Sequence, residues 1–204
     1  NEAKVKSHYT LGQAIADGYV KVPVIVYRKD GTKDERTQLR DACSLLHVKE
    51  AAYDAYRAAT PDADPVKPVL FVVASSIEHA DEVGALLAQP DFIGDGAAVL
   101  HITSQSSDEA LAALADVESA TSPIRAIVSV NMLKEGWDVR NVTVIVGLRE
   151  YSAESKILPE QTLGRGLRRM YFGTDTRETV SVMGTPAFME FVESIQTEGV
   201  SFEH

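Results

Sequence analysis

The stretch Val69-Leu-Phe-Val-Val-Ala74, followed by Ser75-Ser-Ile-Glu78, decides the fold class of this chain of 204 residues. Six successive apolar residues are typical of a strand that is buried on both faces of a sheet. A serine followed three residues later by a glutamate is a capping box, which predicts that a helix begins here and continues to about residue 88. A buried strand that leads directly into a helix favours an α/β fold with helices on both faces of a sheet.

The same alternation continues through the rest of the chain. Residues 97–102 predict a second strand, and Ser106-Ser-Asp-Glu109 predicts the start of a second helix. Further strands are expected at residues 126–130, 142–148 and 179–183, and helices at residues 159–169 and 186–196. Because such units form right-handed crossovers, we expect a three-layer α/β/α fold with a mainly parallel sheet. Ligands of these sheets bind beyond the carboxyl ends of the strands.

The first 65 residues have a different pattern. A short strand is expected at residues 22–27, followed by a turn at Lys29-Asp-Gly-Thr32. A helix is then predicted from apolar positions that roughly follow a period of 3.6, namely Leu39, Cys43, Leu46, Tyr53 and Tyr56. Pro61-Asp-Ala-Asp-Pro65 breaks this pattern. We therefore predict a connecting segment at 1–65 and an α/β lobe at 66–204.

Composition limits the class of protein. The chain is 45% hydrophobic and 25% charged, as in soluble globular proteins, and its longest apolar runs are far shorter than the ~20 residues of a membrane span. The single cysteine, Cys43, and the absence of a signal peptide favour a cytoplasmic protein. No initiator methionine is present, so we expect a processed chain or an excised fragment. The histidines have no metal-ligand spacing, and no metal site is expected.

The net charge of the chain does not identify its binding partner. The net charge of −10 disfavours nucleic-acid binding over the whole surface, although a local basic groove is compatible with it.

The segment Pro159-Glu-Gln-Thr-Leu-Gly-Arg-Gly-Leu-Arg-Arg169 is suited to bind phosphate. On a helix, Gln161, Arg165 and Arg168 lie at i, i+4 and i+7 and share one face. Arginine donates paired hydrogen bonds to phosphate and stays charged. Gly164 and Gly166 each cost about 1 kcal/mol in a helix relative to alanine. Their presence favours a close approach of another group to the backbone. A solvated basic helix end is the simpler interpretation.

A second candidate segment is Ser129-Val-Asn-Met-Leu-Lys-Glu-Gly-Trp-Asp-Val139, which connects two predicted strands. Gly136 allows a sharp turn, and Asp138 can accept hydrogen bonds from a sugar hydroxyl. A turn with Trp137 packed into the core explains the same residues.

Together these segments resemble superfamily 2 helicases. Leu133-Lys-Glu-Gly-Trp-Asp138, Gly147-Leu-Arg149 and residues 157–169 look like motifs V and VI, and Val69-Leu-Phe-Val-Val-Ala-Ser75 looks like motif IV. The form closest to these residues is the Res (restriction) subunit of type III restriction enzymes. Residues 9–23 resemble the stretch that follows the first motor lobe there. The resemblance implies the second, C-terminal RecA-like lobe of a DNA helicase or translocase.

In that family, two RecA-like lobes clamp ATP between them. The resemblance implies that Arg165 and Arg168 reach the γ-phosphate as arginine fingers and that Gln161 orders the site. Gly136 and Asp138 would lie at the ribose side of the nucleotide, and Gly164 would let it approach the backbone. The other lobe would hold both ATP and Mg²⁺.

The resemblance also implies contacts to duplex DNA through its phosphate backbone, from Ser75, Ser76, Thr103 and Asn131. Its implied protein partners are the N-terminal motor lobe of the parent protein and a modification methyltransferase subunit. No Gly-x-x-x-x-Gly-Lys-Ser/Thr motif is present, so we expect this chain alone not to hydrolyse ATP. The alternative is a stand-alone α/β binding module that uses the helix at 159–169 as an anion- or protein-docking surface.

Overall fold

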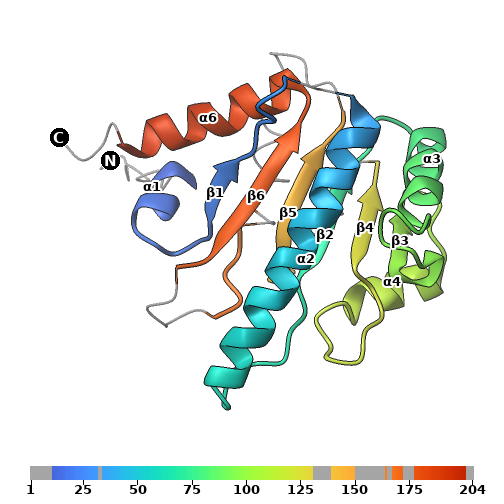
Figure 1. Ribbon diagram of the computed structural model, residues 1–204, viewed down its shortest axis with the longest axis horizontal. Coiled ribbons are helices and arrows are strands. Elements are labelled where there is room, and N and C mark those ends of the chain that lie inside the picture. The colour runs from blue at the N-terminus through green and yellow to red at the C-terminus, as the bar shows by residue number, and fades with distance from the viewer. Residues whose placement is uncertain are drawn as a thin grey trace, which may run out of the picture.

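Six parallel strands form a single sheet in the order β1-β6-β5-β2-β4-β3 (Figure 1). The structure is a computed structural model that describes residues 11–31, 34–130, 139–149, 164, 167–171 and 177–200, with side chains to residue 196. The strands are β1 (Val22–Ile25), β2 (Val69–Val73), β3 (Val99–Ile102), β4 (Ala126–Ser129), β5 (Val142–Gly147) and β6 (Thr179–Gly184). The predicted parallel α/β sheet is therefore confirmed.

Both faces of the sheet are covered by helices, which makes three layers. On β2, Leu70 and Val72 pack on the side of α2 (Glu35–Ala59) and α3 (Ile77–Leu87). Phe71 and Val73 point to the other side, where α1 (Leu11–Ala16), α4 (Asp108–Ala115) and α6 (Pro186–Val200) lie. The continuous apolar run of β2 is needed because each of its faces meets a core. A 3₁₀ turn, η1 (Gly96–Ala98), precedes β3 and replaces the start of the second predicted strand.

The first 65 residues contribute to the same sheet and core. β1 pairs with β6 in parallel, and α2 lies across the sheet in front of β5 (Figure 1). Leu39 and Leu46 of α2 are fully buried. Glu50 accepts hydrogen bonds from Nε and Nη2 of Arg125, at 2.7 and 2.8 Å, and so ties α2 to the start of β4. The predicted boundary between a connecting segment at 1–65 and a lobe at 66–204 stays a prediction.

The helix starts differ from the predicted capping boxes by one residue. Ser76, not Ser75, is the N-cap of α3, and its Oγ accepts a hydrogen bond from the backbone N–H of His79 at 3.1 Å. Ser107, not Ser106, caps α4 through the N–H of Ala110. In both cases the first serine stays in the loop and its Oγ makes local hydrogen bonds, from Ser75 to His79 and from Ser106 to residues 101 and 103.

The predicted helix at 159–169 does not extend to Arg169. Gly164 is helical, but Leu167 lies in a turn and Arg168 forms an isolated antiparallel bridge with Val20. The carbonyl of Leu167 accepts a hydrogen bond from the N–H of Lys21 at 2.6 Å, and its side chain is fully buried. This tertiary pairing ends the helix, so Arg168 does not share a helical face with the preceding segment. Residues 159–163, 165 and 166 lie outside the described residues.

Candidate nucleotide and nucleic-acid site

The carboxyl-terminal edge of the sheet collects the positions predicted to contact nucleic acid. Ser75 and Ser76 follow β2, Thr103 follows β3, and β4 lies between these two strands and leads towards Asn131. Neighbouring strands are about 4.8 Å apart, so the three loops start side by side. Asn131 itself lies outside the described residues. The strand order thus brings together positions that are far apart in the sequence.

Ser75 is exposed and is held by a short chain of side chains. Its Oγ lies 2.8 Å from Nδ1 of His79, and its N–H donates to the same nitrogen at 3.1 Å. On the far side of the ring, Nε2 of His79 lies 2.7 Å from Oε1 of Glu35. Because Nδ1 accepts from a backbone N–H, the remaining ring nitrogen is the one placed to donate to Glu35. The loop after β2 is therefore fastened to the start of α2.

The loop after β3 is fastened locally. Thr103 Oγ1 accepts from the N–H of Gln105 at 3.1 Å, and its own N–H donates to Ser106 Oγ at 2.8 Å. Ser106 in turn donates to the carbonyl of His101 at 3.3 Å. This turn places hydroxyl groups at the edge of the sheet, and hydroxyls and backbone N–H groups are common donors to nucleic-acid phosphates.

The loops after β5 and β6 connect to the same edge. Nη1 of Arg149 donates to the carbonyl of Val130 at 3.4 Å, and Oγ1 of Thr185 donates to the carbonyl of Arg149 at 3.4 Å. At Gly147 a Cβ would lie 2.5 Å from the ring of Phe188, so this position requires glycine. Our sequence reasoning did not assign a site role to Arg149 or Thr185. The order of neighbouring strands, which no motif encodes, was the missing signal.

The structure separates Arg168 from this edge. Arg168 is exposed and lies beside Val20, before β1 begins, at the amino-terminal edge of the sheet. At Gly164 no described atom lies within 4 Å of the place of a Cβ, so packing inside the described chain does not explain that glycine. The other predicted nucleotide contacts lie outside the described residues, namely Gly136, Asp138, Gln161 and Arg165.

A pocket of about 320 Å³ opens at the β1–β6 end of the same edge. Its lining combines Tyr27, Met183 and Met189 with the carboxylates of Asp41 and Glu193, and Arg28 in the same lining is paired with Asp30 and Asp41. Sequence reasoning missed it, because it is formed by segments from both ends of the chain. Apolar and acidic side chains disfavour a phosphate, so this pocket is not a candidate for the ATP phosphates.

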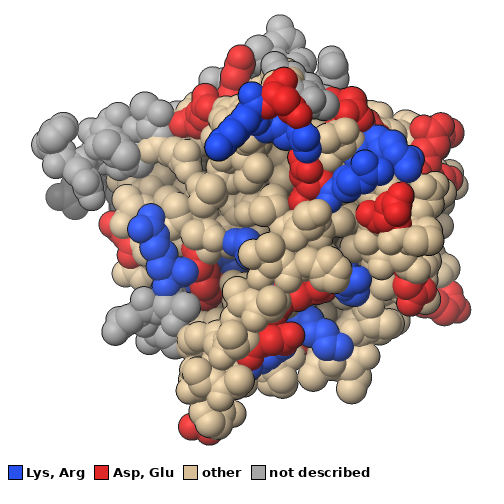
Figure 2. Space-filling view, in the orientation of Figure 1, with Lys and Arg blue, Asp and Glu red and all other residues tan. Residues whose placement is uncertain are grey.

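Surface charge and the distribution of metal-binding side chains limit the kinds of ligand that the described residues can hold. Basic and acidic side chains alternate over the described part of the face shown in Figure 2, without a broad basic patch. The described residues include no group of three His, Cys, Asp or Glu side chains that could hold a metal ion.

Burial raises the pKa of the Cys43 thiol to about 11, so the thiol stays protonated and unreactive at neutral pH. No helix in the described ranges is long and apolar enough to cross a bilayer.

Comparisons with known proteins show what the fold is. No family model matches the sequence, and no curated protein gives a significant match. A fragment of a putative HsdR subunit of a type I restriction enzyme from Vibrio vulnificus YJ016 is 20% identical, with a TM-score of 0.55 over 96% of this chain. The C-terminal domain of the DEAD-box protein Dbp5 is 16% identical, with a TM-score of 0.54 over 92% of this chain and 89% of that domain.

S. cerevisiae Dbp5 bound to RNA and ADP BeF3 is similar to the same degree, with 16% identity and a TM-score of 0.54 over 91% of this chain. The chain spans 36% of the restriction-enzyme fragment and 41% of that Dbp5 chain. These likenesses define the fold as that of a RecA-like helicase C-terminal lobe, which confirms the predicted fold class.

Proposed function

We propose that this chain is the C-terminal motor lobe of an ATP-dependent DNA helicase or translocase of a restriction system. The observation that carries the proposal is the agreement between fold and motif order. A sheet like that of helicase C-terminal lobes spans nearly the whole chain, and the segments that resemble helicase motifs IV and V leave adjacent strands, β2 and β4, at one edge. The type III Res subunit remains the particular parent proposed, on its sequence resemblance alone.

In this proposal the chain completes a site that another lobe begins. ATP and Mg²⁺ are assigned to the N-terminal lobe, because this sequence has no phosphate-binding loop. Gly136, Asp138 and Gly164 are assigned to the nucleotide, and Ser75, Ser76, Thr103 and Asn131 to the DNA backbone. Among the three described residues assigned to the DNA backbone, Ser75 is the exposed one, and its hydroxyl, which donates to Nδ1 of His79 in this structure, would donate to a phosphate oxygen instead.

The arginine-finger role is assigned first to Arg165. Arg168 keeps its proposed role only if it leaves its bridge with Val20, because that bridge lies at the opposite edge of the sheet. Gln161 is proposed to order the site between them. Arginine fingers stabilise the charge of the transferring phosphoryl group and contribute about 10³–10⁵ in rate.

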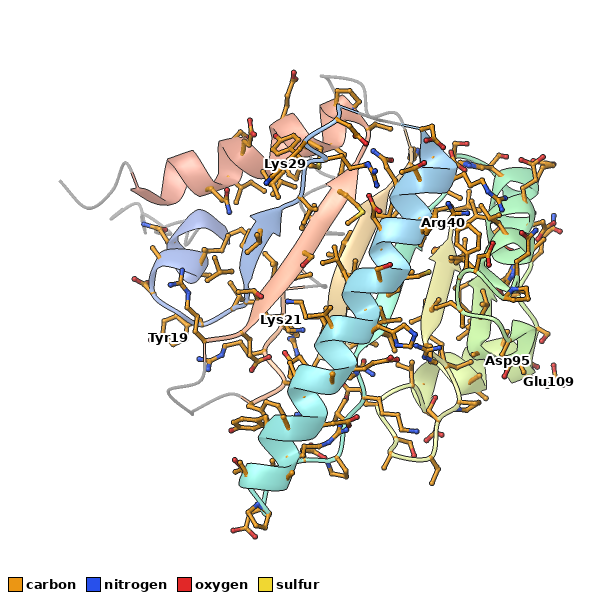
Figure 3. The ribbon with its side chains drawn as sticks, viewed as in Figure 1. Tyr19, Lys21, Lys29, Arg40, Asp95 and Glu109 are labelled. Atoms are coloured by element: carbon orange, nitrogen blue, oxygen red, sulfur yellow. The ribbon has the colours of Figure 1, made fainter. Side chains whose placement is uncertain are left out.

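The first test is ATP turnover in the longer protein that contains this chain. We expect Arg165→Ala to lower kcat by about 10³ or more with an unchanged fold, because a finger acts mainly in the transition state. Arg168→Ala tests the second assignment. Arg40→Ala is the matched control, since Arg40 is an exposed arginine on α2 (Figure 3). Normal turnover in both variants would contradict the arginine-finger proposal.

The second test is nucleic-acid binding by the same protein. Titrations with duplex DNA and with RNA of the same sequence, each at several salt concentrations, compare the two substrates. A phosphate-tracking surface gives affinity that falls steeply with salt. We expect Ser75→Ala to weaken duplex DNA binding, with Ser194→Ala on α6 as the exposed serine control. Equal loss in both variants, or binding that does not depend on salt, would count against the edge described above.

A further inference from the structure

A second, smaller pocket lies at the other end of the sheet, where α2 passes the start of β6. It has a volume of about 190 Å³ and is named here the tyrosine pocket, after Tyr53, Tyr56 and Tyr171, which line it. Figure 1 shows that α2 continues beyond the amino-terminal edge of the strands, which leaves its last turns next to the start of β6. No motif of the sequence pointed to this place.

One stripe of α2 forms the first wall of the pocket. Lys49, Ala52, Tyr53 and Tyr56 all line it. Their spacing of i, i+3, i+4 and i+7 puts them on one face of the helix. Both α2 tyrosines are only half-buried, in contrast to the fully buried leucines earlier in the helix. The aromatic end of α2 therefore presents ring surface to the pocket.

Tyr171 supports these rings from behind. Its ring centroid lies 4.6 Å from that of Tyr56 and 5.8 Å from that of Tyr53, with tilted planes. Tyr171 itself is 6% exposed, and its hydroxyl donates to the carbonyl of Asp64 at 3.2 Å. The three rings are thus held in fixed positions by packing, and a planar ligand would meet a surface that is already ordered.

Two cations line the same pocket, Lys49 and Arg177. Lys49 Nζ donates to Thr179 at two oxygens, the backbone carbonyl at 3.1 Å and Oγ1 at 2.7 Å. Neither cation pairs with a carboxylate of a described residue. Burial lowers the pKa of the Lys49 ammonium, as expected for a partly desolvated charge with neutral partners. An anion in the pocket would compensate this charge.

The one acid in the lining, Glu178, does not cancel these cations. It is 4% exposed, and its two oxygens accept the backbone N–H groups of Met170 and Tyr171, both at 2.8 Å. Arg169 Nε lies 3.7 Å from the same carboxylate. Its charge is therefore satisfied inside the protein, and the surface that faces a ligand is aromatic and cationic.

We propose that the tyrosine pocket binds a nucleotide, with its base against the rings of Tyr53 and Tyr56 and its phosphate beside Lys49 and Arg177. Stacking on aromatic side chains combined with nearby cations is how proteins hold single nucleotides and unpaired strands. The volume is below the ~300 Å³ at which pockets for whole drug-sized ligands begin, so one ring enters and the phosphate stays at the rim. This site is independent of the carboxyl-terminal edge assigned to DNA and ATP above.

The test is an NMR titration of the isotope-labelled chain with three ligands: adenosine 5′-monophosphate, inorganic phosphate, and an oligothymidylate of about eight nucleotides, within the site sizes of single-strand binders. We expect the mononucleotide to shift the amide signals of Tyr53, Tyr56 and Thr179, whereas phosphate alone shifts them much less. Tighter binding of the oligonucleotide identifies an unpaired strand as the source, and equal binding identifies a free nucleotide. Shifts confined to Ser75, Ser76 and Thr103 would overturn the proposal while leaving the DNA-binding edge intact.

Two pairs of variants make the test specific. Tyr56→Leu keeps an apolar side chain but removes the ring. Tyr19→Leu is its control, because Tyr19 is 55% exposed and lies between α1 and β1, outside the lining of the pocket (Figure 3). Arg177→Ala removes an exposed cation without disturbing the core, with Arg40→Ala as control. We expect each pocket variant to weaken mononucleotide binding at least about fivefold, the lower end of measured stacking effects. Affinity unchanged in Arg177→Ala and in folded Tyr56→Leu would overturn the assignment, as would equal binding of phosphate and mononucleotide.

Discussion

The two edges of the sheet hold their polar groups in opposite ways. At the carboxyl-terminal edge, Ser75 and Thr103 are held by bonds to nearby exposed or half-buried groups. At the amino-terminal edge, Lys21 is fully buried and donates from Nζ to the carbonyls of Arg140 and Val142, at 2.6 and 2.5 Å (Figure 3). Glu178 is buried beside it and fastens residues 170 and 171.

The carboxyl-terminal edge is therefore the one whose polar groups can contact ligands, whereas the buried charges of the amino-terminal edge hold the fold together. The bonds of Lys21 join residues 119 and 121 positions apart, and those of Glu178 join the start of β6 to the end of the preceding segment. Lys21 thereby joins the segment before β1 to the start of β5. These bonds also supply partners for a buried charge, which would be very costly to leave unpaired. Hydroxyls at the other edge stay accessible to solvent and to phosphate. The tyrosine pocket is the exposed exception at the amino-terminal edge.

Removing the carboxylate of Glu178 should cause the largest loss of stability at the amino-terminal edge. Glu178→Ala leaves two buried backbone N–H groups and Arg169 without the carboxylate, and we expect a loss of roughly 3–5 kcal/mol in the free energy of unfolding. Urea unfolding of the chain measures it. Glu190→Ala on the exposed face of α6 is the control and should stay within about 0.5 kcal/mol. A loss below about 1 kcal/mol for Glu178→Ala would show that the amino-terminal edge does not depend on this charge.

Stability should depend on pH through Lys21. Burial lowers the pKa of the Lys21 ammonium from 10.5 to about 7. Below pH 7 both folded and unfolded chains carry the proton, whereas between pH 7 and 10.5 the unfolded chain alone retains it. The free energy of unfolding should therefore rise with pH across this window, by at most ~1.4 kcal/mol per pH unit.

Lys21→Met isolates this contribution. Urea unfolding at pH 6 to 9, in steps of about one unit, should give a smaller rise for the variant than for the natural chain, because methionine does not titrate. Parallel curves for the two proteins would contradict the assignment of the pH dependence to Lys21.

Adding a methyl group at Gly147 tests how tightly the core is packed at the carboxyl-terminal edge of the sheet. Gly147→Ala puts a Cβ 2.5 Å from the buried ring of Phe188, and we expect a loss of roughly 1–3 kcal/mol in thermal or urea unfolding. Gly84→Ala is the matched comparison, since its Cβ meets only the end of the half-exposed His101 ring, which can move. If the two variants lose equal stability, packing does not distinguish these sites.

The smallest effect concerns the serine pair after β2. Ser76→Ala removes the N-cap of α3 and should cost about 1 kcal/mol of stability. Ser75→Ala removes only an exposed bond to His79 and should change stability by less than about 0.5 kcal/mol. Urea unfolding of both variants decides the capping register, and the reverse order of losses would restore Ser75 as the cap.

Much of the fold follows from local patterns in the sequence. The apolar runs at β2 and β5 predict buried strands because both of their faces meet helices. The helix after β2 was predicted from Ser75 and Glu78, but one residue too early, because the side chain of the next serine, Ser76, caps the helix through the N–H of His79 without a glutamate at the matching position. The helix predicted at 159–169 was wrong at its end, because Arg168 is not helical. The hydrogen bond between Lys21 and Leu167 outweighs the helical preference there.

The candidate site was predictable only in part. The helicase resemblance implied roles for Ser75, Ser76 and Thr103, which follow predicted strands, and the structure places those strands on either side of β4. Gln161, Arg165, Gly136, Asp138 and Asn131 lie outside the described residues, and their roles stay predictions. Arg149 was not predicted as a tie between loops, because the bond from its side chain to Val130 depends on strand order.

The sequence by itself determined the strand-and-helix alternation around Val69–Val73, the parallel sheet and the edge where ligands are expected, because these depend on local periodicity and chain direction. Tertiary structure alone decided that β1 from the start of the chain pairs with β6 near its end. It also decided that Lys21 is buried and that tyrosines from α2 meet Tyr171. These contacts join residues more than a hundred positions apart, and no local pattern encodes which distant groups meet.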